Sequence, residues 1–260
     1  PTTISETEMQ TIQFDNSEDS ITILSTPLTS PSGNPGENTG ISVWFGARNL
    51  INVFPSFLSS SPPLLGSSAL ELGAGAGLTG IWLARRFPGL DLTLTDGVDE
   101  VLPLLRENVG QNCSDCRPPT IEKLLWGATL KKRYDLIYGA DLVYERCDEE
   151  KVRALARTVR SGLSSVPWPS IPATSGAEHD PDEDVVLSLA VPAFPCFLLA
   201  LTRRSFPLPQ LLALFREEGL GCDGLLENGC WDIFENETDG MTDMWRDVVL
   251  GFTPLEVSNG

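Results

Sequence analysis

The chain has 260 residues, enough for one sizeable α/β domain, and we expect a single domain with added segments. Its 36 acidic residues outnumber 18 basic ones, which gives a formal net charge of -18. Because phosphate backbones are bound mainly through Lys and Arg, this balance argues against a nucleic-acid partner and favours, at most, a basic protein partner.

Neither secretion nor membrane insertion is expected. The first twenty residues are polar and acidic and do not resemble a signal peptide. The longest apolar run, VVLSLAVPAFPCFLLAL at 185–201, is shorter than a membrane span of about 20 residues and contains two prolines. Six scattered cysteines, including the Cys113-Ser-Asp-Cys116 pair, match neither a disulfide framework nor a zinc site. We therefore expect no metal and a cytoplasmic location, with the nucleus also compatible.

The elements follow one another in α/β order. Weak alternation in TIQF and ITIL predicts a β-hairpin, and ISVWFGARNLINVF predicts an amphipathic helix that ends at Pro55. Strand and helix patterns then alternate. The predicted strands are SSALEL, DLTLTD, PTIEKLLW and YDLIYGAD, and the predicted helices are LTGIWLARRF, VDEVLPLLRENV and residues 148–163. Such alternation predicts a mainly parallel sheet covered on both faces.

The C-terminal third is less regular. Residues 164–184, rich in Pro, Ser and acids, predict a flexible surface insertion. A strand ending in FLLALTRR, the helix PLPQLLALFREEGL and two short strands around GCDGLL and CWDIF follow. The predicted domain organisation is an N-terminal extension with the hairpin at 1–40, the main domain at 41–234, and a C-terminal tail at 235–260.

A glycine-rich loop within ALELGAGAGLTG, residues 69–80, joins the first strand of this series to its helix. Glycines let a ligand approach the backbone and the first amides of a helix. Asp96 ends the second strand about 20 residues further on, where a carboxylate accepts hydrogen bonds from ribose hydroxyls. Both features fit a dinucleotide, and both also fit S-adenosylmethionine.

Glu71 favours the second cofactor. It stands just before the glycines, where a pyrophosphate would meet a negative charge. S-adenosylmethionine carries a sulfonium and an ammonium, for which nearby acids are tolerable or useful. The loop holds no Lys or Arg, and the chain shows no Tyr-x-x-x-Lys or His-acid pair of an NAD-dependent oxidoreductase.

Five ordered motifs carry a resemblance to a known family. They are VWFGARNL, ELGAGAGLTGIWLA, TDG with VLPLLRENV, LLWG, and DLIYGADLVYE. In this order they resemble the motifs of seven-strand S-adenosylmethionine-dependent methyltransferases. Within that class they are similar to family 16, the protein-lysine methyltransferase-like group. The resemblance is close over 41–163 and looser over the predicted hairpin before it and over 196–234 after it. It implies an α/β, Rossmann-like, doubly wound fold with a mainly parallel seven-strand sheet, and S-adenosylmethionine as cofactor.

The resemblance also implies which residues hold the cofactor. The methionine part would be lined by Gly73, Ala74 and Gly75, with Glu71 beside them. Asp96 would hold the ribose, and Trp126 would stand beside the adenine. Ala140 would close the pocket, and Trp44 would approach it from the N-terminal helix. For the two tryptophans the alternative is that they are core aromatics.

The stretch from Asp141 to Tyr144 matches the acid-x-x-aromatic motif that this family carries after its fourth strand. A carboxylate there can orient an ammonium, and an aromatic face can hold it by cation-π attraction. The alternative is an acid that caps the next helix.

The activity that the resemblance implies is methylation of a lysine on a non-histone protein, such as a translation factor or chaperone. We expect a basic, lysine-presenting protein substrate and a monomeric enzyme. The alternatives are methylation of a histidine or a small-molecule amine, and a catalytically silent scaffold that only binds the cofactor.

Overall fold

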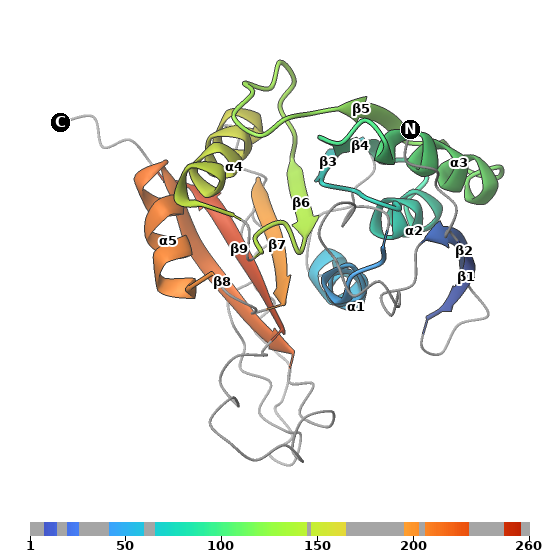
Figure 1. Cartoon of the computed structure of the whole chain (residues 1–260), viewed down its shortest axis with the longest axis horizontal. Helices are drawn as coiled ribbons and strands as arrows, with labels where there is room; N and C mark the ends of the chain where they lie inside the picture. The colour runs from blue at the N-terminus through green and yellow to red at the C-terminus, as the bar shows by residue number, and fades with distance from the viewer. Residues whose placement is uncertain are drawn as a thin grey trace, which may run out of the picture.

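The computed structural model of the chain describes residues 8–14, 20–25, 42–59, 66–144, 147–164, 195–202, 206–228 and 247–255. These residues form a seven-stranded sheet with helices on both faces and a separate two-stranded hairpin (Figure 1). The structure thereby confirms the predicted fold class.

The strands of the large sheet are ordered β5-β4-β3-β6-β7-β9-β8. Their bounds are β3 Ser68–Leu72, β4 Asp91–Asp96, β5 Thr120–Lys123, β6 Leu136–Ala140, β7 Cys196–Thr202, β8 Leu220–Asn228 and β9 Asp247–Pro254. The first five strands in this order pair in parallel, whereas β9 pairs antiparallel with both β7 and β8. The sheet is therefore mainly parallel, as predicted.

Helices cover the sheet in two layers. On one face lie α1 (Phe45–Ser59), α2 (Leu78–Arg86) and α3 (Val101–Asn112), and on the other lie α4 (Glu149–Gly162) and α5 (Leu208–Glu217) (Figure 1). Two apolar clusters fill these layers. Successive side chains of β3 point to opposite faces of the sheet. Ala69 therefore belongs to the first cluster, with α1, α2 and α3, and Leu70 and Leu72 belong to the second, with α4 and α5.

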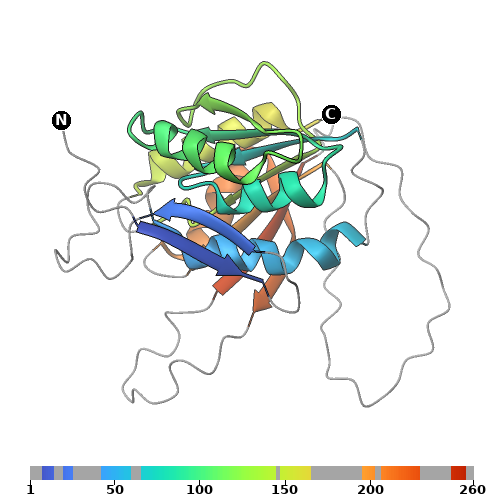
Figure 2. The same ribbon diagram turned by 90° about the vertical axis from the view of Figure 1, so that its right-hand side faces the viewer.

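The hairpin consists of β1 (Glu8–Gln13) and β2 (Ser20–Ser25), paired antiparallel, as the alternation predicted. Figure 2 shows it beside the helices of the first layer. Ile12, Ile21 and Ile23 are buried in the same cluster as residues of α1, α2 and α3. The hairpin is thus packed onto the main body of the fold.

One helix boundary was predicted wrongly. Helix α1 continues through Pro55 to Ser59 instead of ending there. A proline inside a helix removes one backbone hydrogen bond and costs about 3 kcal/mol. Leu50 and Phe54, both fully buried on this helix, offset that cost by packing into the core.

Strand β9 comes from the segment 235–260 that we set apart as a C-terminal tail. It lies between β7 and β8, with Phe252 opposite Phe197 on β7. Part of that segment therefore belongs to the sheet. The predicted strand at CWDIF and residues 165–184 of the predicted insertion lie outside the described residues.

The order of the strands has a topological switch point at β3. Its neighbours are β4 on one side and β6 on the other, so the chain changes direction across the sheet at this strand. In open α/β sheets, ligands bind at such a point, beyond the carboxyl ends of the strands. The loops that follow β3, β4 and β6 meet there.

Candidate functional site

The glycine loop after β3 has a backbone that requires glycine. The φ angles of Gly73, Gly75 and Gly77 are 60°, 55° and 89°. Residues with a side chain rarely adopt such angles. The Ala74 amide donates to the Thr95 carbonyl at 2.8 Å, which fixes the loop against the end of β4. The loop then leads directly into the N-terminus of α2.

Asp96 is the last residue of β4 and contacts this loop. Its Oδ2 accepts a hydrogen bond from the Gly75 amide at 3.1 Å, and its Oδ1 accepts one from the Val98 amide at 3.0 Å. Burial raises the pKa of Asp96, although these amides and that of Gly97 act in the opposite direction. The structure thus brings the predicted ribose-binding carboxylate and the predicted glycine loop together.

Glu71 lies on β3 beneath α2, with only 3% of its surface exposed. Its carboxyl group accepts a hydrogen bond from the Tyr138 hydroxyl at 3.2 Å and another from the Gly80 amide. A Cβ at Gly80 would lie 2.6 Å from Glu71 Oε2 and would also collide with Leu94. Gly80 is therefore a packing residue of α2. That Glu71 also faces the cofactor stays a prediction.

Burial raises the pKa of Glu71 from 4.5 to about 8, and the nearby charge of Asp96 contributes in the same direction. The hydrogen bonds from Tyr138 and Gly80 oppose this shift without cancelling it. At neutral pH Glu71 is therefore mostly protonated and neutral beneath the loop.

The raised pKa of Glu71 predicts a pH-dependent stability. The stabilisation that comes from the protonated form is fully present below the unfolded pKa near 4.5 and is lost as pH rises through about 8. Between pH 4.5 and pH 8 the free energy of unfolding falls by on the order of 5 kcal/mol. Glu71→Gln stays neutral at every pH, so its free energy of unfolding should fall less between pH 5 and pH 9 than that of the wild type. Urea unfolding measures this difference.

Glu122→Gln on β5 is the matched control, because Glu122 is exposed and its removal should leave the wild-type pH dependence in place. Parallel stability curves for the wild type and Glu71→Gln would contradict the assigned pKa.

Asp141 follows β6 directly and adopts a φ of 51°, the one positive φ among the described non-glycine residues. Its amide donates to the Ala200 carbonyl on β7 at 2.8 Å. Its Oδ2 accepts a hydrogen bond from the Gly46 amide at 2.8 Å, in the first turn of α1. A Cβ at Gly46 would lie 2.7 Å from the same oxygen. Gly46 therefore permits α1 to approach the carboxylate this closely.

The alternative role for Asp141, a cap of the next helix, does not hold. Helix α4 is capped by Asp148, whose side chain accepts a hydrogen bond from the Lys151 amide at 2.8 Å. Asp141 instead contacts the N-terminus of a helix 95 residues earlier in the chain. The sequence carries no signal for Gly46, because only this contact distinguishes it from any other helical glycine.

Leu142 connects the acid motif to the glycine loop. A Cβ at Gly73 would lie 2.6 Å from its side chain, and a Cβ at Gly139 would lie 2.5 Å from it. Two residues further on, Tyr144 is 39% exposed. The loop after β6 therefore packs against the loop after β3 while Tyr144 stays accessible to a ligand.

Three predicted residues remain, each at a different element. Trp44 is half-buried immediately before α1, and Ala140 is half-buried at the end of β6. Trp126 is half-buried in the turn after β5 and packs against the second apolar cluster. The next residue, Gly127, donates to Thr158 Oγ1 on α4 at 2.8 Å. The assignment of these three residues to a cofactor stays a prediction.

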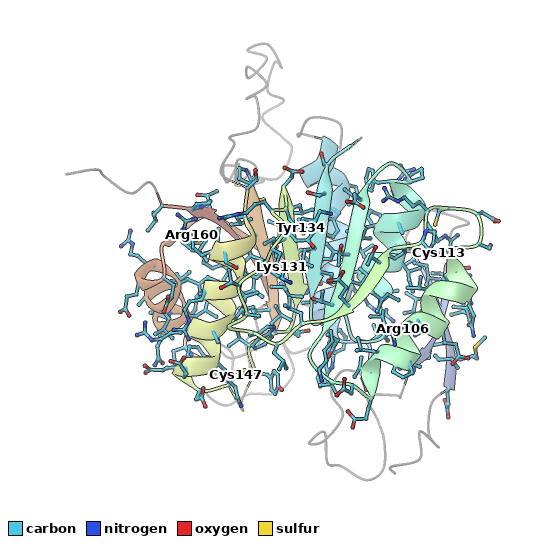
Figure 3. All side chains as sticks on the ribbon, turned by 90° about the horizontal axis from the view of Figure 1, so that it is seen from above. Arg106, Cys113, Lys131, Tyr134, Cys147 and Arg160 are labelled. Carbon is cyan, nitrogen blue, oxygen red and sulfur yellow. The ribbon has the colours of Figure 1, made fainter. Side chains whose placement is uncertain are left out.

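Among the described residues, no group of three or more His, Cys, Asp or Glu side chains could hold a metal ion. Figure 3 places Cys113 near the end of α3 and Cys147 beside the start of α4, far apart in the molecule. No helix in the described part of the chain is long and apolar enough to span a membrane.

Solved structures similar to this chain include methyltransferases. Magnesium protoporphyrin IX methyltransferase from Synechocystis, with bound S-adenosylhomocysteine, has a TM-score of 0.54 at 11% identity, over 84% of this chain and 89% of that one. A glycopeptide N-methyltransferase with sinefungin has a TM-score of 0.53 at 14% identity, over 80% of this chain and 94% of that one. At these identities the likeness establishes the fold.

The family follows from the sequence match. The lysine methyltransferase family model matches residues 33–167, just over half of the chain. The protein belongs to this family, as the resemblance of its motifs indicated.

Curated relatives carry names consistent with that family. An EEF1A lysine methyltransferase 3 from Xenopus tropicalis is 35% identical over 114 residues, 42% of this chain and 48% of that protein. A protein N-lysine methyltransferase METTL21A from Danio rerio is 39% identical over 102 residues, 37% of this chain and 44% of that protein. The chain spans about half the length of these relatives.

Proposed function

We propose that this protein is an S-adenosylmethionine-dependent methyltransferase that methylates a lysine side chain of a non-histone protein. The observation that carries the proposal is that the ends of β4 and β6, each with an aspartate, meet the glycine loop. Asp96 accepts a hydrogen bond from Gly75 in that loop, and Asp141 is followed by Leu142, which packs against Gly73. Membership of the lysine methyltransferase family supports the same conclusion.

The residues around the loop fit a cationic cofactor. Residues 73–77 contain no basic side chain that would pair with a pyrophosphate. Asp96 presents a carboxylate at the end of β4, suited to accept hydrogen bonds from the two ribose hydroxyls. When bound, S-adenosylmethionine supplies a methyl group activated by a sulfonium.

We assign the other cofactor contacts as follows. The backbone of Gly73, Ala74 and Gly75 lines the methionine part, with Glu71 beside them. Trp126 lies beside the adenine, Ala140 closes the pocket, and Trp44 covers it from the start of α1.

Asp141 and Tyr144 receive the acceptor lysine. The carboxylate orients the lysine ammonium, and the exposed ring of Tyr144 holds it by cation-π attraction. Lysine has a reference pKa of about 10.4 and must lose a proton before it can react. Water or Asp141 accepts that proton, so the activity should rise toward alkaline pH. The main contribution of the protein is then to hold the neutral amine in line with the methyl group of the cofactor.

The substrate is a basic, lysine-presenting protein. A formal net charge of -18 favours encounter with a partner of opposite charge. The relatives named for EEF1A and for protein N-lysine methylation support a protein acceptor, such as a translation factor. We further propose a monomeric enzyme in the cytoplasm, in keeping with its scattered cysteines.

Incubation with S-adenosylmethionine carrying a labelled methyl group and a cell lysate tests this function. The expected result is a labelled protein band that disappears when S-adenosylhomocysteine is added in excess. Label in small molecules alone would favour the small-amine alternative. Cofactor binding by calorimetry without transfer to any fraction would favour the silent scaffold.

A further inference from the structure

Two asparagines of α3 bind the backbone of the N-terminal hairpin. Asn112 accepts from the Thr22 amide at 3.3 Å and donates to the Thr22 carbonyl at 2.7 Å. Asn108 accepts from the Leu24 amide at 2.7 Å and donates to the Leu24 carbonyl at 2.9 Å. Each carboxamide thus makes both hydrogen bonds that a neighbouring strand would make.

The spacing of the two asparagines matches the spacing of the strand. Alternate residues of a β-strand direct their amide and carbonyl to the same side and lie about 6.8 Å apart. Residues four apart on a helix rise by about 6 Å. Asn108 and Asn112 therefore match Thr22 and Leu24 along the edge of β2 that faces away from β1.

Asn108 makes a further contact that Asn112 does not make. Its Nδ2 also donates to the Ala76 carbonyl at 2.9 Å, and its side chain is 0% exposed. Ala76 lies in the glycine loop between Gly75 and Gly77, both with positive φ. One buried carboxamide therefore joins β2 to the loop.

The loop is held from two sides. Asp96 accepts from the Gly75 amide at 3.1 Å, and Asn108 donates to the carbonyl of the next residue, Ala76, at 2.9 Å. Ala74 and Ala76 are buried in the same apolar cluster as Ile21 and Ile23 of the hairpin. Displacement of β2 would therefore remove support from the residues that shape the loop.

We propose that Asn108 is a positioning residue for the cofactor loop and that the N-terminal hairpin acts through it as part of the cofactor site. This inference rests on the proposed function, because it assumes that the loop binds S-adenosylmethionine. Docking of the hairpin and binding of the cofactor then favour each other, since such coupling is reciprocal.

Asn108→Ala and Asn112→Ala form a matched pair of variants. Both remove a carboxamide that binds β2, but only the first removes the hydrogen bond to the loop. Calorimetry with S-adenosylmethionine should show affinity weakened about tenfold in Asn108→Ala and by less than about twofold in Asn112→Ala. Urea unfolding should show that both variants lose stability, so a general loss of stability would not produce the difference in affinity.

A measurement on the wild type covers the case in which Asn108→Ala does not fold. Hydrogen exchange at the Leu24 amide should slow when S-adenosylmethionine is added. Equal affinities for the two variants, or unchanged exchange at Leu24 on cofactor binding, would overturn the inference and leave the proposed function intact. A wild-type protein that binds no S-adenosylmethionine would overturn both.

Discussion

Asp141→Asn is expected to lower the rate of methyl transfer by at least about a hundredfold while S-adenosylmethionine still binds. Asparagine tolerates the φ of 51° at this position and keeps an oxygen that can accept the hydrogen bond from the Gly46 amide. The substitution therefore removes the charge and leaves the local backbone in place. Transfer of label measures the rate, and calorimetry measures cofactor binding.

The control for this variant is Asp148→Asn. Asp148 also presents a carboxylate to a helix N-terminus, but its acceptor role is at α4, where it binds the Lys151 amide. Activity within about twofold of the wild type is expected there, because asparagine is an equally good cap. Full activity in Asp141→Asn would contradict the role of this carboxylate in receiving the lysine.

Asp96→Asn is expected to weaken the affinity for S-adenosylmethionine by about tenfold to a hundredfold. Hydrogen bonds to a charged group contribute about 1.5–3 kcal/mol each, and the ribose would lose such a partner. The change is isosteric, so the contact with the Gly75 amide can persist through the remaining carbonyl oxygen. Calorimetry with the pure protein gives the affinity directly.

Asp91 at the opposite end of β4 supplies the matched control. Its carboxylate forms ion pairs with Arg117 at 2.8 Å and with Lys132 at 2.5 Å, at a partly exposed position. Asp91→Asn should change stability slightly, because exposed ion pairs contribute little, and should leave cofactor affinity unchanged. Equal affinity in Asp96→Asn and the wild type would contradict the ribose assignment.

The main elements of the fold could be predicted because they depend on local patterns. Apolar spacing indicated α2, the placement of charged residues indicated α4, and short apolar or alternating runs indicated β3, β4 and β6. The glycine loop and Asp96 were recognisable from their positions after successive strands. These features are determined by periodicity and by chain order, which the sequence contains directly.

Features that depend on contacts between distant segments could not be predicted. The Gly46 amide meets Asp141 across 95 positions, and Asn108 meets Leu24 across 84. Strand β9 also depends on its neighbours, since only pairing with β7 and β8 places it in the sheet. The passage of α1 through Pro55 depends on the core that buries Phe54.

The most direct test of the proposed lysine methylation is the identity of the labelled residue after transfer from S-adenosylmethionine. The labelled protein is isolated, hydrolysed to amino acids and separated against standards. We expect the label in methylated lysine, and we expect it to be absent from a parallel reaction with Asp141→Asn. Label in methylhistidine or methylarginine, or equal labelling by the variant, would contradict the proposed lysine site at the end of β6.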